Sequence, residues 1–67
     1  MITEEDFVLF KSLVEIADRS FDGHLTVMKF TTNWRVGFGT PDNRDAINGM
    51  AVGKTFADAA QKALGSR

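Results

Sequence analysis

Gly53-Lys54-Thr55 is the segment of the chain whose residue types most suggest chemistry, since it has the ending of a phosphate-binding loop. In such loops, backbone amides and a lysine hold phosphate oxygens. The motif needs another glycine five residues before Gly53, and this chain has Asn48 there. We therefore interpret Gly53 as a strand end and Thr55 as a helix cap. Anion binding by backbone amides beside Lys54 is the open alternative.

The single histidine, His24, would need a nucleophile or an orienting carboxylate to act in catalysis. Asp22 is two residues away and Ser20 is the nearest serine, so we interpret His24 as a turn residue at the start of a strand. We expect no catalytic or cofactor-binding residues in this chain.

An acidic segment, Asp42, Asn43 and Asp45, has the beginning of a calcium-binding loop. The twelfth position counted from Asp42 is Gly53, where such a loop requires a bidentate glutamate. With one histidine and no cysteine, a zinc site built by the protein alone is also disfavoured. We expect no metal ligands.

Aromatic and basic residues alternate between positions 29 and 38, a pattern that suits nucleic-acid binding. Trp34 and Phe38 would stack on bases, while Lys29 and Arg35 would contact phosphates. The alternative is that the aromatic residues belong to the core and the charges to the solvated surface. Net charge favours this alternative, because nine acidic and eight basic residues leave −1.

Length limits the chain to one domain, residues 1–67. Size scaling gives a folded surface of roughly 4,200 Å². The free energy gained by burying apolar area is then about equal to the entropy cost of ordering the chain. Since no cysteine is present to form a disulfide, a second chain is a natural source of further burial. The acidic first residues and the lack of a long apolar run favour a cytoplasmic protein without a membrane segment.

A first helix is predicted near Glu4–Arg19, capped by Thr3 with Asp6 three residues later. Its apolar residues span about 180°, whereas a helix lying on one sheet needs a stripe of only ~100°. The apolar face of this helix is therefore wider than one packing partner can cover. Asp22-Gly23 is a turn signal after it.

Two antiparallel strands are predicted at Leu25–Phe30 and Trp34–Gly39, joined by a three-residue loop with Asn33 in the left-handed conformation. In this register Phe30 pairs with Trp34, and one sheet face is predicted to be a continuous apolar surface of Met28, Phe30, Trp34, Val36 and Phe38. The other face carries Leu25, Val27, Lys29 and Arg35. A two-residue loop is the alternative register, which places Lys29 beside Trp34.

The remaining chain predicts a polar loop with one helical turn after Pro41 and an Asn48-Gly49 stop, then a short strand at Met50–Gly53 and a last helix capped by Thr55. The fold class is therefore α+β, in the order helix, three-stranded antiparallel sheet, helix (αβββα), with both helices packed on one sheet face.

The last helix resembles that of double-stranded-RNA-binding domains, through Gly53-Lys54-Thr55 and the pattern Ala59-Ala60-x-x-Ala63-Leu64. The resemblance implies a shared αβββα order and RNA contacts. The basic pair of that family is replaced here by Phe56, Ala57 and Asp58. Separately, the run from His24 to Pro41 is similar to a segment of short uncharacterised bacterial proteins, a likeness that implies no activity.

The main functional hypothesis is a non-enzymatic module that forms a homodimer and acts through protein–protein contact. The predicted interface residues are the apolar surplus of the first helix and of the second sheet face: Leu9, Leu13, Ile16, Leu25 and Val27. The connector Ser20–Gly23 is a candidate hinge for exchange of the first helix between protomers. The alternative is an RNA-binding module that uses Arg35, Lys54 and Lys62.

Overall fold

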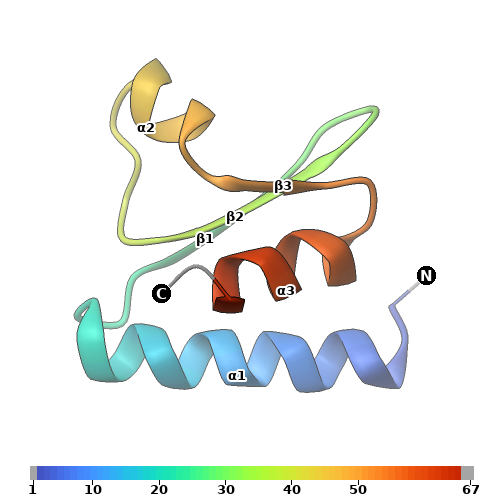
Figure 1. Cartoon of the computed structure of the whole chain (residues 1–67). Coiled ribbons are helices and arrows are strands. Elements are labelled where there is room, and N and C mark those ends of the chain that lie inside the picture. The colour runs from blue at the N-terminus through green and yellow to red at the C-terminus, as the bar shows by residue number, and fades with distance from the viewer. Residues whose placement is uncertain (1, 66–67) are drawn as a thin grey trace.

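The computed structural model describes residues 2–65, which form a three-stranded sheet with two helices beneath it and a short helix above it (Figure 1). The elements are, in chain order, α1 (Glu4–Ser20), β1 (Leu25–Lys29), β2 (Trp34–Phe38), α2 (Arg44–Asn48), β3 (Ala51–Gly53) and α3 (Phe56–Gly65). The predicted α+β class and order are confirmed, with α2 as the predicted helical turn between the second and third strands.

The ends of α1 follow from local hydrogen bonding. The Thr3 hydroxyl accepts from the Asp6 N–H at 3.1 Å, and the Asp6 carboxylate accepts from the Thr3 N–H at 3.2 Å. This capping box satisfies amides that the first turn leaves without helical partners. At the other end, Asp22 and Gly23 have positive φ angles of 55° and 80°, and the Gly23 N–H donates to the Ala17 carbonyl at 2.8 Å. The predicted cap and turn are both confirmed.

The sheet has the strand order β1-β2-β3 with antiparallel neighbours. Its register differs by one residue from the predicted one: Lys29, not Phe30, pairs with Trp34, and Val27 pairs with Val36. The loop is closed by the Phe30 N–H donating to the Asn33 carbonyl at 2.8 Å. Within residues 2–65, Asp22 is the one non-glycine residue with positive φ, so the left-handed conformation predicted for Asn33 is wrong.

Burial explains why the observed register is favoured. It places Leu25 and Val27 on the same face as Trp34, Val36 and Phe38, so the helix-facing side of the sheet is apolar along both strands. This register places a lysine on the apolar face, but the free-energy cost of doing so is small. The Lys29 side chain is exposed at the strand end, with its ammonium 5.8 Å from the centre of the Trp34 ring.

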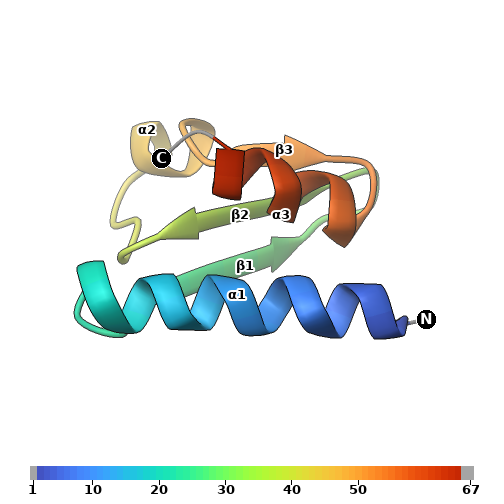
Figure 2. The ribbon, with the colours of Figure 1, turned by 60° about the horizontal axis from the view of Figure 1, so that its bottom comes forward.

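Both long helices pack on that face, as predicted. Figure 2 shows α1 running alongside β1 and α3 lying across β2 and β3. The core between these layers has Leu13 and Val36 fully buried at its centre, with four residues of α3 closing it: Phe56, Ala59, Ala60 and Ala63. The alanines let α3 approach the sheet closely.

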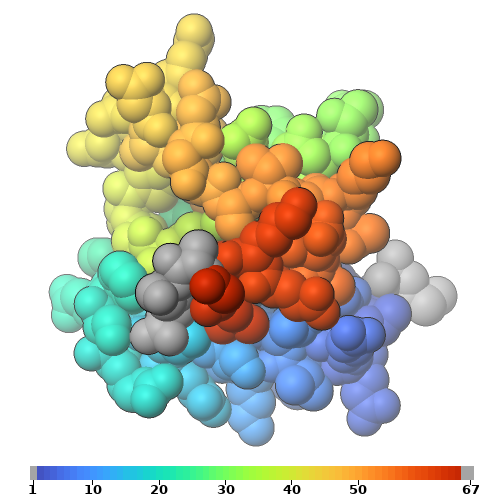
Figure 3. Space-filling model, in the orientation of Figure 1, coloured from blue at the N-terminus to red at the C-terminus, as the bar shows by residue number. Residues whose placement is uncertain are grey.

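The other sheet face is partly covered by α2, which stands out from the body in the space-filling view (Figure 3). The Arg35 side chain lies on this face and donates to the Ile47 carbonyl at the end of α2, at 3.2 Å. Met50 is buried against Gly37, where its side chain uses the space that a Cβ would need. The face predicted to be a continuous apolar surface, with Met28 and Phe30 beside Trp34, is therefore divided between the two sides of the sheet.

Candidate protein–protein interface

Four large exposed apolar side chains gather where the N-terminal half of α1 lies beside β1. Ile2 is 67% exposed, Phe7 61%, Phe10 45% and Val27 36%. With Trp34 and Phe56 they line a hollow of about 230 Å³. We call Ile2, Phe7, Phe10 and Val27 the α1–β1 surface. Contiguous apolar patches of this kind mark interaction sites more often than scattered exposed residues do.

The width of the apolar face of α1 produces this surface. Leu13, Ile16 and Ala17 point into the core, and they are 0%, 7% and 1% exposed. Phe7 and Phe10 follow one another at helical spacing on a flank of the same helix, beyond the stripe that α3 and the sheet cover. The excess apolar width of this helix lies on the flank toward β1.

Leu13 and Ile16, which were predicted to be dimer-interface residues, lie in the core of the protomer. Leu9 and Leu25 are partly buried and pack against that core. The prediction that Leu25 and Val27 lie on a second sheet face is wrong, because the observed register puts both on the helix-facing side. Of the five predicted interface residues, Val27 is the one that the structure leaves at an exposed apolar surface.

Phe7, Phe10 and Ile2 were missing from the predicted interface. A usable signal was present, since Phe7 and Phe10 lie off the axis of the inward stripe that Leu9, Leu13 and Ile16 define. Separating the inward stripe from its flank requires knowing which side of α1 meets α3, and sequence periodicity alone does not give that.

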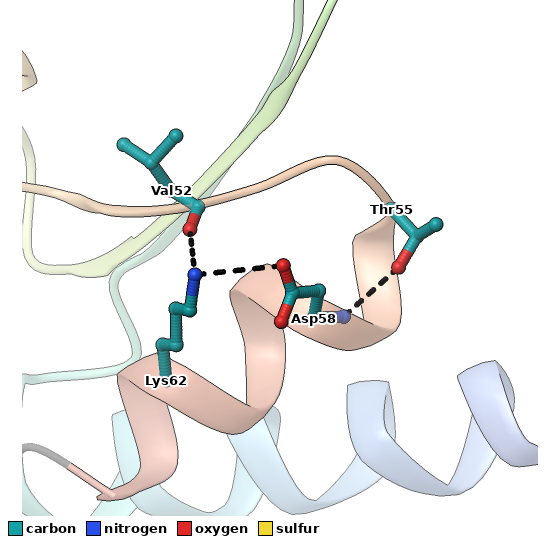
Figure 4. A network of polar contacts seen from close by, with 4 residues as sticks. All are labelled: Val52, Thr55, Asp58 and Lys62. Carbon is teal, nitrogen blue, oxygen red and sulfur yellow. Dashed lines mark hydrogen bonds and ion pairs between the residues drawn. The ribbon is translucent and has the colours of Figure 1, made fainter.

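Of the three basic residues of the RNA hypothesis, Arg35 lies apart from Lys54 and Lys62. Arg35 is on the sheet face away from α1 and α3, with its guanidinium 5.8 Å from the centre of the Phe30 ring. Lys54 is exposed in the turn before α3. Lys62 extends from α3 to the Val52 carbonyl at 3.0 Å and the Asp58 carboxylate at 3.5 Å (Figure 4). Arg35 and Lys62 are thus already used within the chain.

The other motifs have structural roles in this fold. Asn43 caps α2, since its side-chain oxygen accepts from the Ala46 N–H at 2.8 Å. Thr55 caps α3 by accepting from the Asp58 N–H at 3.1 Å, as predicted (Figure 4). His24 is exposed, and its carbonyl accepts from the Gly39 N–H at 2.8 Å. Trp34 packs edge-on against Phe56 with ring centres 5.7 Å apart, so it faces the core.

A broader groove of about 670 Å³ lies on the sheet face that α2 borders. Its polar lining includes two arginines, Arg35 and Arg44, and one aspartate, Asp42. The side-chain oxygen of Asn33 is buried at this groove without a hydrogen-bond partner. The mixed charges give the groove no clear preference for one class of ligand.

Comparison of the chain with protein-family models, curated proteins and solved structures finds no significant match. Within residues 2–65, no three histidine or acidic side chains come together as a metal site would require. Over the same residues, none of the helices combines the length and the apolar composition that crossing a bilayer requires.

Proposed function

We propose that this chain is a non-enzymatic α+β module that acts through protein–protein contact and forms a homodimer. The observation that carries the proposal is the α1–β1 surface, in which two phenylalanines and two aliphatic residues stay exposed around an apolar hollow. Aromatic side chains at the centre of a patch are the usual anchors of protein interfaces. A chain without cysteine also suits the reducing cytoplasm, where we place it.

A short chain has a thermodynamic reason to use such a surface. A domain of 67 residues buries only about 60% of the surface that its unfolded chain exposes, which leaves it marginal when alone. A second copy that covers Phe7 and Phe10 supplies further burial without any change in the protomer fold. This homodimer keeps α1 on its own chain, so the helix exchange suggested by the Ser20–Gly23 connector is not needed.

Replacing Phe7 and Phe10 together by serine is expected to convert the homodimer to monomer, because it removes the aromatic anchors of the α1–β1 surface. Hot-spot residues of this type each contribute about 2 kcal/mol or more to association, so the loss of one should raise the dissociation constant ~30-fold and the loss of both should raise it further. Sedimentation equilibrium at micromolar concentration measures it. Val8→Ser is the matched control, since Val8 is 58% exposed on the same helix but does not line the hollow. A monomeric parent chain, or a double variant that dimerises like its parent, would contradict the proposal.

The second candidate function is RNA binding of the double-stranded-RNA-binding type, favoured by one observation: the αβββα order with both long helices on one sheet face. Lys54 is the exposed cation best placed for it, in the turn before α3. The engagement of Lys62 and Arg35 within the chain weighs against this function.

RNA binding predicts that affinity for a structured RNA duplex falls steeply with salt and that Lys54→Ala lowers the slope of log K against log salt by about 1. Electrophoretic mobility shifts over a salt series measure both. Lys11→Ala is the control, because Lys11 is an exposed lysine on α1 and not in that turn. If no duplex is shifted even at low salt, this second function is wrong.

A further inference from the structure

The link between α2 and β3 contains Asn48-Gly49, a dipeptide in which the chain can react with itself. The side-chain carbonyl carbon of an asparagine is an electrophile, and the backbone nitrogen of the next residue is the nucleophile nearest to it. A glycine at that next position leaves the nitrogen open to approach, because it has no Cβ and has the widest choice of backbone angles. Asn48-Gly49 therefore has the residue types that succinimide formation, the first step of asparagine deamidation, needs.

The chain has three asparagines, and they differ in how their side chains are held. The Asn33 amide nitrogen donates to a neighbouring hydroxyl at 3.3 Å, and a tryptophan follows it in the sequence. The Asn43 amide nitrogen donates to the Asp42 carboxylate at 3.1 Å, and its oxygen accepts from the Ala46 N–H at 2.8 Å. Asn48 is exposed, and within residues 2–65 its side chain makes no hydrogen bond. Asn48 is thus the asparagine whose side chain is free to react.

The backbone of α2 holds the nucleophile back. The Gly49 N–H donates to the Asp45 carbonyl at 3.0 Å, and the Met50 N–H donates to the Ile47 carbonyl at 3.1 Å. While these bonds last, the Gly49 nitrogen is fixed at the end of a helical turn and does not turn toward the side chain of Asn48. Attack therefore requires the last turn of α2 to open.

Opening of α2 is a small, local change. The helix has five residues, none of them buried, and it stands out from the body (Figure 3). The Arg35 guanidinium ties it to the sheet through the Ile47 carbonyl at 3.2 Å. Segments with few buried apolar contacts open at a free energy well below that of global unfolding. The Gly49 nitrogen is therefore released while the core stays folded.

We propose that Asn48 is a site of spontaneous deamidation by the Gly49 backbone nitrogen, and that α2 is the gate that sets its rate. When α2 opens, the Gly49 nitrogen bonds to the Asn48 side-chain carbon, the bond from that carbon to Nδ2 breaks, and ammonia leaves with the proton of the Gly49 amide. Water then opens the cyclic succinimide. Hydrolysis at the former side-chain carbonyl gives aspartate, and hydrolysis at the main-chain carbonyl gives isoaspartate.

Both products alter the groove beside α2. Asn48 lines this groove together with Arg35 and Arg44, so either product adds a carboxylate to a lining that contains two guanidinium groups. Isoaspartate also lengthens the main chain by one methylene between α2 and β3. That change falls inside the turn closed by the Met50 N–H and the Ile47 carbonyl, so we expect this bond to be lost.

Peptide mass mapping of the full chain, after prolonged incubation in mildly alkaline buffer, tests the site. Exchange of the side-chain NH₂ for OH is expected at least ~10-fold faster at Asn48 than at Asn33 or Asn43, because each of those precedes a residue with a bulky side chain. Gly49→Ala is the matched variant: its Cβ would meet nothing closer than 3.5 Å, so the fold is kept, and the rate at Asn48 should fall about 10-fold. Fragmentation of the product peptide is expected to show both aspartate and isoaspartate.

Two further rates test the gate. Chain unfolded in urea should deamidate at Asn48 at least ~10-fold faster than folded chain, since the Gly49 nitrogen is then always free. Asn43→Ala removes the cap of α2 and should speed the reaction in the folded chain about 5-fold. An unreactive Asn48 in the folded chain, or aspartate formed without isoaspartate, would overturn the proposed reaction. Equal rates in folded and unfolded chain, or an unchanged rate in Asn43→Ala, would show that α2 is not the gate.

Discussion

Replacing Gly53 by alanine is expected to remove about a third or more of the free energy of folding, although the substitution adds a single methyl group. A Cβ at Gly53 would overlap the Ala59 backbone nitrogen and lie 2.8 Å from the Asp58 Cβ. These atoms belong to the first turn of α3, so relief requires the helix to move away from β3. Overpacking of this kind costs about 3 kcal/mol, out of a total of roughly 3–10 kcal/mol for a chain of this length.

Thermal unfolding followed by circular dichroism should register this cost as a midpoint about 12–24 °C lower. Gly49→Ala is the matched control, because its nearest contact would be an ordinary 3.5 Å and its φ of −82° suits any residue. We expect that variant to match the parent or to exceed it by about 0.5 kcal/mol, through a less flexible unfolded chain. Equal midpoints for Gly53→Ala and the parent would mean that α3 does not sit this close to β3.

The helices were predictable because their signals are local. Thr3 with Asp6, and Thr55 with Asp58, are caps that depend on a spacing of three residues, and both serve as caps in the structure. The Asn48-Gly49 stop also depends only on neighbours, and α2 ends there. None of these features requires knowledge of what the helix packs against.

The strand register was not predictable in the same way, because a two-residue loop and a three-residue loop give registers of similar free energy. The predicted loop kept Lys29 off the apolar face, and the observed one brings Leu25 and Val27 onto that face beside Val36. A lysine at a strand end keeps its ammonium in solvent, so its presence on the apolar face costs little. The predicted register was wrong because it treated Lys29 as a buried charge, whereas the Lys29 side chain is exposed.

The sequence predicts that the first helix carries an exposed apolar surface, but it does not predict which residues form that surface. The excess apolar width of the first helix is a property of the sequence, and the exposed phenylalanines are its consequence. Assigning Leu13 and Ile16 to the surface failed because residues at the centre of the stripe are the ones that the core takes first. The surplus belongs to the flank, where Phe7 and Phe10 lie.

Replacing Leu13 by alanine separates the two readings of α1 most directly, because the core and interface roles predict opposite results. Leu13 is 0% exposed and lies in the core cluster with Val36 and Ala59. Truncating a buried leucine in this way costs about 3 kcal/mol, counting the lost transfer free energy and the cavity left behind. Urea unfolding at a protein concentration below the dimer dissociation constant measures this loss on the monomer alone.

Val8→Ala is the control for that measurement, since Val8 is on the same helix and 58% exposed, and it should change the free energy of unfolding by less than about 0.5 kcal/mol. An interface role would give the reverse pattern for Leu13→Ala: monomer stability unchanged and the dimer lost. The expected result is a destabilised monomer whose remaining folded fraction still associates, because Phe7, Phe10 and Val27 are intact. Burial then assigns Leu13 to the protomer core and leaves association to the α1–β1 surface.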